Sequence, residues 1–221
     1  MQRFFDIFLS GLALVILSPI LVAVILVLRC TGEREVFFLQ ERVGRRGKIF
    51  KLYKFATMLK NSPNIGAGTV TLKNDPRVLP IGRFLRKTKI NELPQLINVL
   101  IGNISLIGPR PQTQRCFDAF PLESQKVIVK VRPGLSGIGS IFFRNEEDML
   151  YHSENAEDFY DNTIMPYKGK LEDWYVSNRS IKLYFALIIA SVVVVISGRV
   201  PFRDSLFAKI PSIPSKLREF F

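Results

Sequence analysis

The sequence predicts a mostly helical α/β protein, in which an apolar N-terminal membrane helix precedes a small globular domain with a β-hairpin and amphipathic interfacial helices. The 221 residues carry a net charge of +12, yet 48% of them are hydrophobic, a combination that excludes a disordered basic tail. The apolar residues gather in two runs, whereas 15 Lys and Arg accompany only five acids between residues 29 and 92. Such a chain is expected to meet a membrane, a polyanion or both.

The first apolar run, residues 7–28, is long enough to cross a bilayer. Arg3 and Arg29 flank it, and no small-residue cleavage pattern follows, so we expect it to remain as an anchor. Pro19 removes one helical N–H and bends the helix, while the Ser18 hydroxyl can donate to the freed carbonyl. The proline leaves a kinked spanning helix and a re-entrant hairpin open, and the basic residues at both ends favour two cytoplasmic ends.

The second apolar run, residues 183–196, is short for a membrane span and fits a buried strand, a core helix or an interfacial helix. The tail after it mixes Phe with Lys and Arg, and we expect it on the membrane surface. The chain therefore divides into a membrane helix (residues 1–29), a globular domain (30–199) and an amphipathic tail (200–221).

Local patterns give the elements of the globular domain in order. Residues 36–39 and 49–55 read as strands around a Gly-Arg-Arg-Gly turn and predict a hairpin. Residues 61–80 are rich in Gly, Pro and Asn, which is typical of a loop. Residues 81–89 place apolar side chains on one helical face and basic ones around it, so this helix suits lipid headgroups.

The next predicted helix runs from Asn91 to residue 102, with Pro94 in its first turn. Asn91 and Glu92 then lie at a helix N-terminus, where backbone N–H groups favour anions. Two stiff turns follow, at residues 108–111 and 132–137, and each contains an arginine. Arginine forks and glycine nests suit a phosphate group.

The remaining composition excludes several kinds of site. Cys30 and Cys116 are too few for a disulfide framework, and we expect reduced thiols. His152 is the single histidine, which excludes a His-based zinc site and a Ser-His-Asp triad. A nucleic-acid partner is not expected, because the basic residues alternate with apolar ones and no recognised nucleic-acid module is present.

The motifs taken in order closely resemble the bacterial sugar transferase family, the monotopic phosphoglycosyl transferases, over roughly residues 3–200. The matching segments are Ser18-Pro19 and residues 37–44 (FFLQERVG), 50–55 (FKLYKF), 75–78 (DPRV), 82–88 (GRFLRKT), 91–96 (NELPQL), 105–111 (SLIGPRP) and 132–137 (RPGLSG).

This resemblance implies an enzyme that transfers a phospho-sugar from a UDP-sugar to a polyprenyl (undecaprenyl) phosphate and releases UMP, with Mg2+ as cofactor. The reaction would start a surface glycan such as an exopolysaccharide, O-antigen, capsule or glycoprotein glycan. The resemblance also implies a re-entrant helix hinged at Ser18 and Pro19, and a monotopic protein on the cytoplasmic face of the bacterial inner membrane. Membrane lipids are the other expected partners, and dimerisation is left open.

One residue departs from the family pattern at the centre of the expected chemistry. The family has an Asp-Glu pair whose Asp attacks the sugar-linked phosphorus, and Asn91 stands at that position here. An amide is a poor nucleophile and brings no charge to Mg2+. Three explanations are open: the chain is inactivated, Glu92 has become the nucleophile, or another carboxylate is recruited. Further differences at Ala56, Asn103 and Ser140 favour a natural divergent branch.

The expected site residues follow from the motifs and the resemblance together. Glu92 is expected to be essential and to bind Mg2+, with Asn91 beside it and one of Glu146, Glu147 or Asp148 supplying the missing carboxylate. A solvated acidic turn is the alternative for those three acids, and Glu172 is either a site residue or a surface charge. The residues expected to bind phosphate or substrate are Arg86, Arg110, Arg132, Gly134 and Gly137, and Lys54 is open between phosphate and membrane.

A second kind of function remains open at this stage. Because of Asn91, the chain could be a catalytically inactive membrane-surface scaffold that binds a UDP-sugar or polyprenyl phosphate without turnover. Turnover of any UDP-sugar by the chain as it stands would exclude that hypothesis. The motifs do not encode which sugar is transferred.

Overall fold

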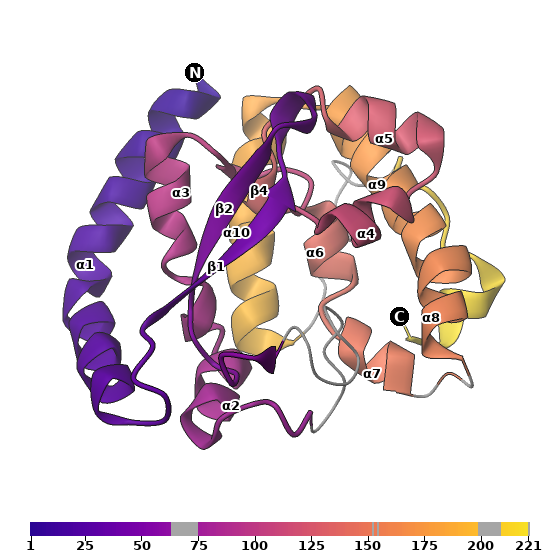
Figure 1. The fold of residues 1–221 in the computed structure, drawn as a ribbon. Helices are drawn as coiled ribbons and strands as arrows, with labels where there is room; N and C mark the ends of the chain where they lie inside the picture. The colour runs from indigo at the N-terminus through magenta and orange to yellow at the C-terminus, as the bar shows by residue number, and fades with distance from the viewer. Residues whose placement is uncertain (63–74, 152, 154, 199–208, 221) are drawn as a thin grey trace.

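The computed structural model describes residues 1–62, 75–151, 153, 155–198 and 209–220. Helices dominate it, and two small two-stranded sheets lie between them (Figure 1). The first half contains α1 (Gln2–Cys30), β1 (Phe37–Val43), η1 (Arg45–Gly47), β2 (Ile49–Phe55), α2 (Pro80–Lys87), η3 (Ile90–Glu92), α3 (Gln95–Ile101) and β3 (Ser105–Ile107). The second half contains α4 (Gln114–Asp118), α5 (Leu122–Ile128), β4 (Gly134–Ser136), α6 (Ile138–Phe142), α7 (Glu146–Tyr151), α8 (Ala156–Phe159), the π-helical turn η4 (Tyr160–Ile164), α9 (Met165–Ser177), α10 (Ile181–Ser197) and η6 (Ser215–Phe220).

Helix α1 is one uninterrupted helix that runs along an edge of the molecule and contains Pro19 (Figure 1). The Ser18 hydroxyl donates to the carbonyl of Val15 at 2.8 Å, the acceptor that a residue other than proline at position 19 would use. This confirms the expected role of Ser18. The expected hairpin is not seen, because the freed carbonyl is satisfied locally and the helix continues past the proline.

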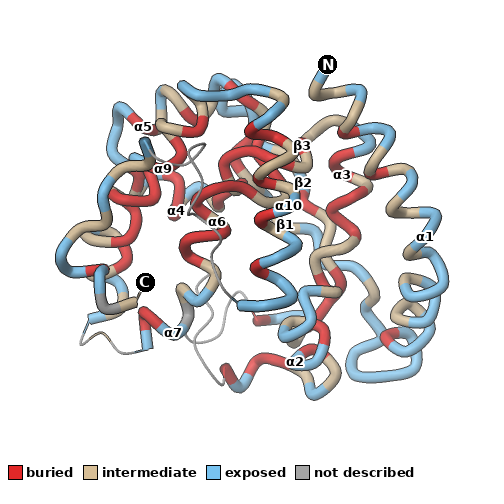
Figure 2. The backbone as a smooth tube through the Cα atoms, turned by 180° about the vertical axis from the view of Figure 1, so that it is seen from behind, coloured by how far each residue is buried: buried red, intermediate tan, exposed pale blue. Residues whose placement is uncertain are grey.

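The two ends of α1 are both attached to the same globular domain. Near its start, the buried Asp6 accepts hydrogen bonds from the hydroxyls of Ser105 and Tyr184, at 2.8 and 2.9 Å. Near its end, Leu28 packs against Phe55 of β2 in a small buried cluster. The outer side of the helix is exposed and apolar (Figure 2). Helix α1 is also long and apolar enough to cross a membrane, and its exposed apolar side indicates membrane association.

The predicted hairpin is confirmed. Strands β1 and β2 pair antiparallel, and the turn between them places Arg46 and Gly47 at positive φ, 60° and 71°. Arg42 pairs with Phe50, and Lys54 pairs with Phe38. Because side chains alternate along a strand, this register puts Arg42 and Lys54 on the same face of the hairpin.

Two other predicted elements can be compared with the structure. The basic amphipathic helix is α2, which buries Leu85 and exposes Phe84. The predicted loop at residues 61–80 lies mostly outside the described residues, as does His152. Helix α2 lies beside the far end of α1 (Figure 1), where its apolar side chains join the cluster around Leu28.

The main core lies between α6, α9 and α10. Helix α10 excludes the strand alternative for the second apolar run, and it buries one side in the core while Ile189 and Ile196 are exposed, so the core-helix and interfacial-helix alternatives both stay open. The described part of the tail, residues 209–220, packs onto this core. Leu217 is fully buried there, and the Tyr167 hydroxyl donates to the carbonyl of Pro211 at 3.0 Å. The apolar side chains of this part cover the core, and its expected position at the membrane surface stays a prediction. Residues 199–208 and 221 lie outside the described residues, and the division into three parts stays a prediction.

Candidate active site

Glu92 and Arg110 form a half-buried ion pair, in which Arg110 Nη2 lies 2.6 Å from Glu92 Oε1. Glu92 ends the short helix η3, and Arg110 lies in the stiff turn that follows β3. The chain therefore brings together two of the residues that the sequence predicted, from motifs 18 residues apart.

Arg42, Lys54 and Lys89 act on this pair, and Arg86 acts on Lys54. Arg42 and Lys54 come from one face of the hairpin, and Arg86 comes from α2. Burial lowers the pKa of Lys54 to about 7, and the charges of Arg42, Arg110 and Arg86 add to this effect. Burial likewise lowers the pKa of Arg42 to about 10, with Arg110 contributing. A concentration of cations with so little acid suits a di- or triphosphate, which would relieve their mutual repulsion.

The ionisation of Glu92 follows from its neighbours. Burial raises its pKa, but the charges of Arg110 and Lys54 and the hydrogen bond from Arg110 outweigh burial and hold the pKa well below the ordinary range. Glu92 is therefore a carboxylate at any working pH. It can bind a cation or attack an electrophile, but it can act neither as a general acid nor as an effective general base near neutrality.

Asn91 lies one residue before Glu92, in η3 and not at an α-helix N-terminus. The expected helix start is therefore displaced, since α3 begins at Gln95 with Pro94 as its N-cap. The Asn91 side chain is buried, and its Oδ1 has no hydrogen-bond partner in the structure. A buried acceptor without a donor costs on the order of 1–3 kcal/mol, which is typical of a place where a water or a ligand binds.

The structure separates the three downstream acids. Glu146 opens α7, and its Oε2 lies 2.5 Å from Lys168 Nζ. Its charge also raises the pKa of Arg110, after the larger effect of Glu92. Asp148 is exposed, and the side chain of Glu147 lies outside the described residues. Glu146 therefore acts on the Arg110 side of the site.

Glu172 of α9 is a buried acid rather than a surface charge. Neither of its oxygens has a hydrogen bond, although the backbone amides of Arg110 and Gly139 lie near enough to lower its pKa. Burial is the larger effect and raises the pKa to about 8. A Cβ at Gly139 would lie 2.4 Å from Glu172 Oε1, so the carboxyl group rests directly on the backbone of α6. A group with such a pKa can exchange a proton near neutral pH.

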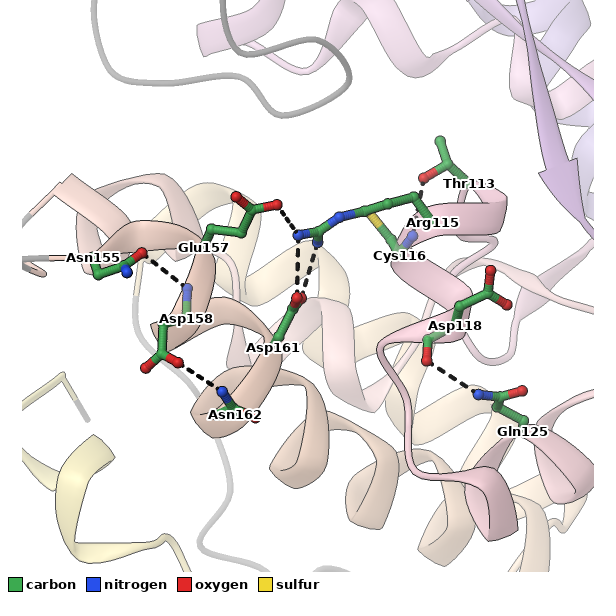
Figure 3. Close-up of polar contacts among 10 residues, drawn as sticks. All are labelled: Thr113, Arg115, Cys116, Asp118, Gln125, Asn155, Glu157, Asp158, Asp161 and Asn162. Carbon is green, nitrogen blue, oxygen red and sulfur yellow. Dashed lines mark hydrogen bonds and ion pairs between the residues drawn. The ribbon is translucent and has the colours of Figure 1, made fainter.

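Arg115 is held between two acids from neighbouring helical segments, Glu157 and Asp161 (Figure 3). Arg115 binds Glu157 at 2.6 Å and Asp161 at 2.9 Å, which ties α4 to α8 and the π-helical turn η4. The Arg115 guanidinium also lies over the ring of Tyr160, 5.6 Å from its centre. Burial and the charge of Glu146 raise the pKa of Tyr160. Sequence reasoning missed the ion pairs of Arg115 and Tyr160, because no local pattern marks a π turn.

Arg132, in the second stiff turn at residues 132–137, lies apart from the Glu92–Arg110 pair. Gly134 and Gly137 pack against Gly108, where an added Cβ on either glycine would lie 2.1 Å from backbone atoms. These glycines permit the close parallel pairing of β3 with β4 and do not form an open nest. Arg132 donates to the carbonyl of Gly102 at 3.1 Å and lines a separate cavity that contains neither Glu92 nor Arg110.

The donors at this site fit the protein share of a Mg2+ site. Mg2+ is usually bound through one or two carboxylates together with waters and substrate phosphates. Glu92 supplies a carboxylate, and Asn91 supplies a buried neutral oxygen without a partner. Among the described residues, no three carboxylate, Cys or His side chains form a cluster that would hold a metal ion without substrate.

The chain matches the family model described as bacterial sugar transferase over residues 1–198. It is similar to the UDP-glucose:undecaprenyl-phosphate glucose-1-phosphate transferase of Escherichia coli K12, with 38% identity over 162 residues, which are 72% of this chain and 35% of that protein. It is also similar to the undecaprenyl-phosphate galactose phosphotransferase of Salmonella typhimurium, with 31% identity over 89% of this chain and 40% of that protein. The exopolysaccharide production protein ExoY of Sinorhizobium fredii is 32% identical over 71% of this chain and 74% of its own length. The chain thus spans less than half of the first two relatives.

Proposed function

The chain belongs to the bacterial sugar transferase family, and we propose that it transfers a sugar phosphate from a UDP-sugar to undecaprenyl phosphate and releases UMP. The product would be an undecaprenyl-diphosphate sugar, on which a surface polysaccharide is then built. This proposal rests on the Glu92–Arg110 ion pair and on the cations of the hairpin and α2 that surround it. A carboxylate held among cations is what a phosphoryl transfer to or from a diphosphate requires.

The residues divide the work as follows. Arg110, Arg42, Lys54 and Arg86 bind the diphosphate and hold its phosphorus in line for displacement. A carboxylate oxygen attacks the phosphorus that carries the sugar, and the bond from that phosphorus to the oxygen of the leaving UMP breaks. An oxygen of undecaprenyl phosphate then displaces the carboxylate. A bound Mg2+ would neutralise phosphate charge, and Glu92 with Asn91 Oδ1 would hold it.

Because Asn91 stands where the family has its attacking Asp, another carboxylate has to attack the phosphorus. We propose that Glu92 is essential and that Glu146 supplies the second carboxylate, because the charge of Glu146 acts on Arg110. Glu172, with a pKa of about 8, is suited to take up and return protons near neutral pH. We leave Arg132, Gly134 and Gly137 out of this site, because Arg132 lines a separate cavity and the two glycines pack against Gly108.

We also propose a monotopic arrangement on the cytoplasmic face of the inner membrane. Because Asp6 and Leu28 attach opposite ends of α1 to one globular domain, a straight spanning helix would need that domain to contact both sides of the bilayer. A helix of 29 residues is about 44 Å long, so the domain accompanies it over more than the thickness of the hydrocarbon core. A re-entrant bend at Ser18 and Pro19, adopted in lipid, would return both ends of α1 to one side of the bilayer and would require one of these two attachments to rearrange.

Asn91 favours one alternative function, a scaffold that binds a UDP-sugar or the polyprenyl phosphate without turnover. The experiment that separates the two incubates the protein with a panel of UDP-sugars, undecaprenyl phosphate and Mg2+ and measures UMP. We expect release with at least one sugar. If the wild type releases none while Asn91→Asp does, the scaffold hypothesis replaces the enzyme. If neither protein releases UMP, the proposed reaction is wrong.

A further inference from the structure

A second basic region lies at the opposite end of α1 from α2, and the proposed reaction does not use it. It is a cavity of about 190 Å3 between the first turns of α1, the hairpin turn η1, the segment before β4 and the end of α9. This volume corresponds to about six waters at 30 Å3 each, which is ample for a phosphate group.

The charges around this cavity are strongly unbalanced. Five cationic side chains line it, from four separate segments of the chain: Arg3, Arg45, Lys130, Arg132 and Arg179. Asp6 is the one acid in the lining, and its Oδ1 already accepts three hydrogen bonds from protein donors. Bringing five like charges to one cavity is unfavourable unless an anion balances them.

The arginines are also held in a way that leaves their donors available. Arg132 donates its Nε–H to the carbonyl of Gly102, and Arg45 donates its Nε–H to Lys130 O at 3.3 Å. Arg179 donates its Nε–H to the carbonyl of Val176 at 3.3 Å. Within the described part of the chain, the terminal N–H groups of these three side chains make no hydrogen bond. Arg3 differs, because both of its terminal nitrogens donate to carbonyls at the end of α3.

We propose that this cavity is a phosphate-binding site, distinct from the site around Glu92. Guanidinium groups fixed through Nε present their remaining N–H pairs in the fork that matches two oxygens of a phosphate. Arg45, Arg132 and Arg179 supply these forks, and Lys130 adds a point charge. Arg132 thereby keeps the phosphate-binding chemistry predicted from its sequence, at a different site.

The position of the cavity favours the headgroup of an anionic phospholipid as the source of the phosphate. The cavity includes Gln2 and Arg3, and the exposed apolar side of α1 starts immediately afterwards with Phe4, which is 67% exposed. Cations next to an apolar membrane-facing surface lie at the depth of lipid headgroups. Free inorganic phosphate offers the same oxygens, and the experiment has to distinguish the two sources.

The test uses the full chain purified in a neutral detergent. In one arm, the melting temperature is followed against inorganic phosphate, with chloride at equal ionic strength as the reference. In the other arm, the protein is taken from bilayer discs of phosphatidylcholine and phosphatidylglycerol, and retained phosphatidylglycerol is counted by native mass spectrometry. The double variant Arg45→Gln with Arg179→Gln removes two forks. The matched control, Arg46→Gln with Lys182→Gln, removes the same charge outside the cavity lining.

We expect the wild type and the control to retain about one phosphatidylglycerol per chain and the double variant to retain at least fivefold less. A phosphate response without lipid retention also supports the site and identifies free phosphate as its ligand. Absence of both responses in the wild type, or equal loss in the double variant and the control, overturns the proposal. If the double variant fails to fold, Lys130→Gln replaces it, because its side chain lines the cavity without a hydrogen bond to a described residue.

Discussion

The two basic regions of this protein differ in how their cations are balanced. Around Arg110, the cations of the hairpin meet Glu92, and Glu146 and Glu172 lie beyond, so charges of both signs are coupled and several pKa values move. Around Arg132, five cations share a cavity with one acid that is already hydrogen-bonded. The first arrangement can bind an anion and supply a carboxylate and a proton acceptor, whereas the second can only bind. Positive charge alone therefore does not tell the two regions apart. The acids around Arg110 identify that region as the candidate active site.

Glu92→Gln should have the largest effect on UMP release. It leaves the first region with cations and no paired carboxylate, as in the second region. The amide keeps the shape but removes the charge that Arg110 pairs with. We expect UMP release to fall at least about 100-fold, the usual contribution of a positioned carboxylate. Binding of UDP should stay the same or become tighter, because one negative charge is removed.

The melting temperature is measured alongside and should fall, because Arg110 and Lys54 lose the carboxylate that balances their charge. Isothermal titration with UDP and an assay of UMP release measure the two quantities separately. Activity equal to that of the wild type would remove Glu92 from the mechanism. A loss of UDP binding as large as the loss of turnover would show that Glu92 only maintains the fold of the site.

For the region around Arg110, the sequence predicted the individual strands and motifs better than it predicted which side chains come together in the fold. The hairpin follows from two strand patterns and a turn of Gly-Arg-Arg-Gly, all within 20 residues. Glu92 and Arg110 were predicted from their motifs. In contrast, Tyr160 and Lys168 reach the site only through tertiary packing, and no local signal marks them.

Tertiary packing also explains why Arg132 was predicted at the site around Glu92 but lines a different cavity. A turn rich in Arg, Pro and Gly has the chemistry to bind phosphate, but its sequence does not say which part of the fold it faces. Pairing with β3 uses Gly134 and Gly137 for backbone contact and turns Arg132 towards α1. Likewise, composition offered three equivalent acids after residue 145, and only the packing of α7 against Lys168 distinguishes Glu146.

Asp6→Ala should have the next largest effect, and it acts on the second region. It removes the oxygen that accepts hydrogen bonds from the Ser105 and Tyr184 hydroxyls and from the backbone N–H of Leu106, so these three donors lose their acceptor. We expect a loss of about 3 kcal/mol of unfolding free energy, measured by denaturant titration in detergent. Asp6→Asn keeps an oxygen acceptor and should lose less. Equal losses in the two variants would show that the charge of Asp6, and not its hydrogen bonds, attaches α1.

Glu146→Gln tests which acid completes the first region. We expect UMP release to fall about tenfold, because the charge that acts on Arg110 and pairs with Lys168 is removed. Asp148→Asn, on the same helix but exposed, is the matched control and should stay within about twofold of the wild type. The reverse order of effects would assign the second carboxylate to Asp148.

Glu172→Gln should change stability in a way that depends on pH, with little difference from the wild type near pH 5. Burial raises the pKa of Glu172 to about 8, against 4.5 for an ordinary glutamate, so the folded protein keeps a proton that the unfolded chain loses between these values. Its contribution to stability is therefore complete below pH 4.5 and is lost as the pH rises through 8, at roughly 1 kcal/mol per pH unit. The neutral amide removes this dependence, so melting temperatures of variant and wild type between pH 5 and 8 should diverge in favour of the variant. Glu123→Gln, which alters an exposed acid, should follow the wild type. Parallel curves for Glu172→Gln and the wild type would mean that Glu172 is ionised in the folded protein, paired with a cation such as Lys168.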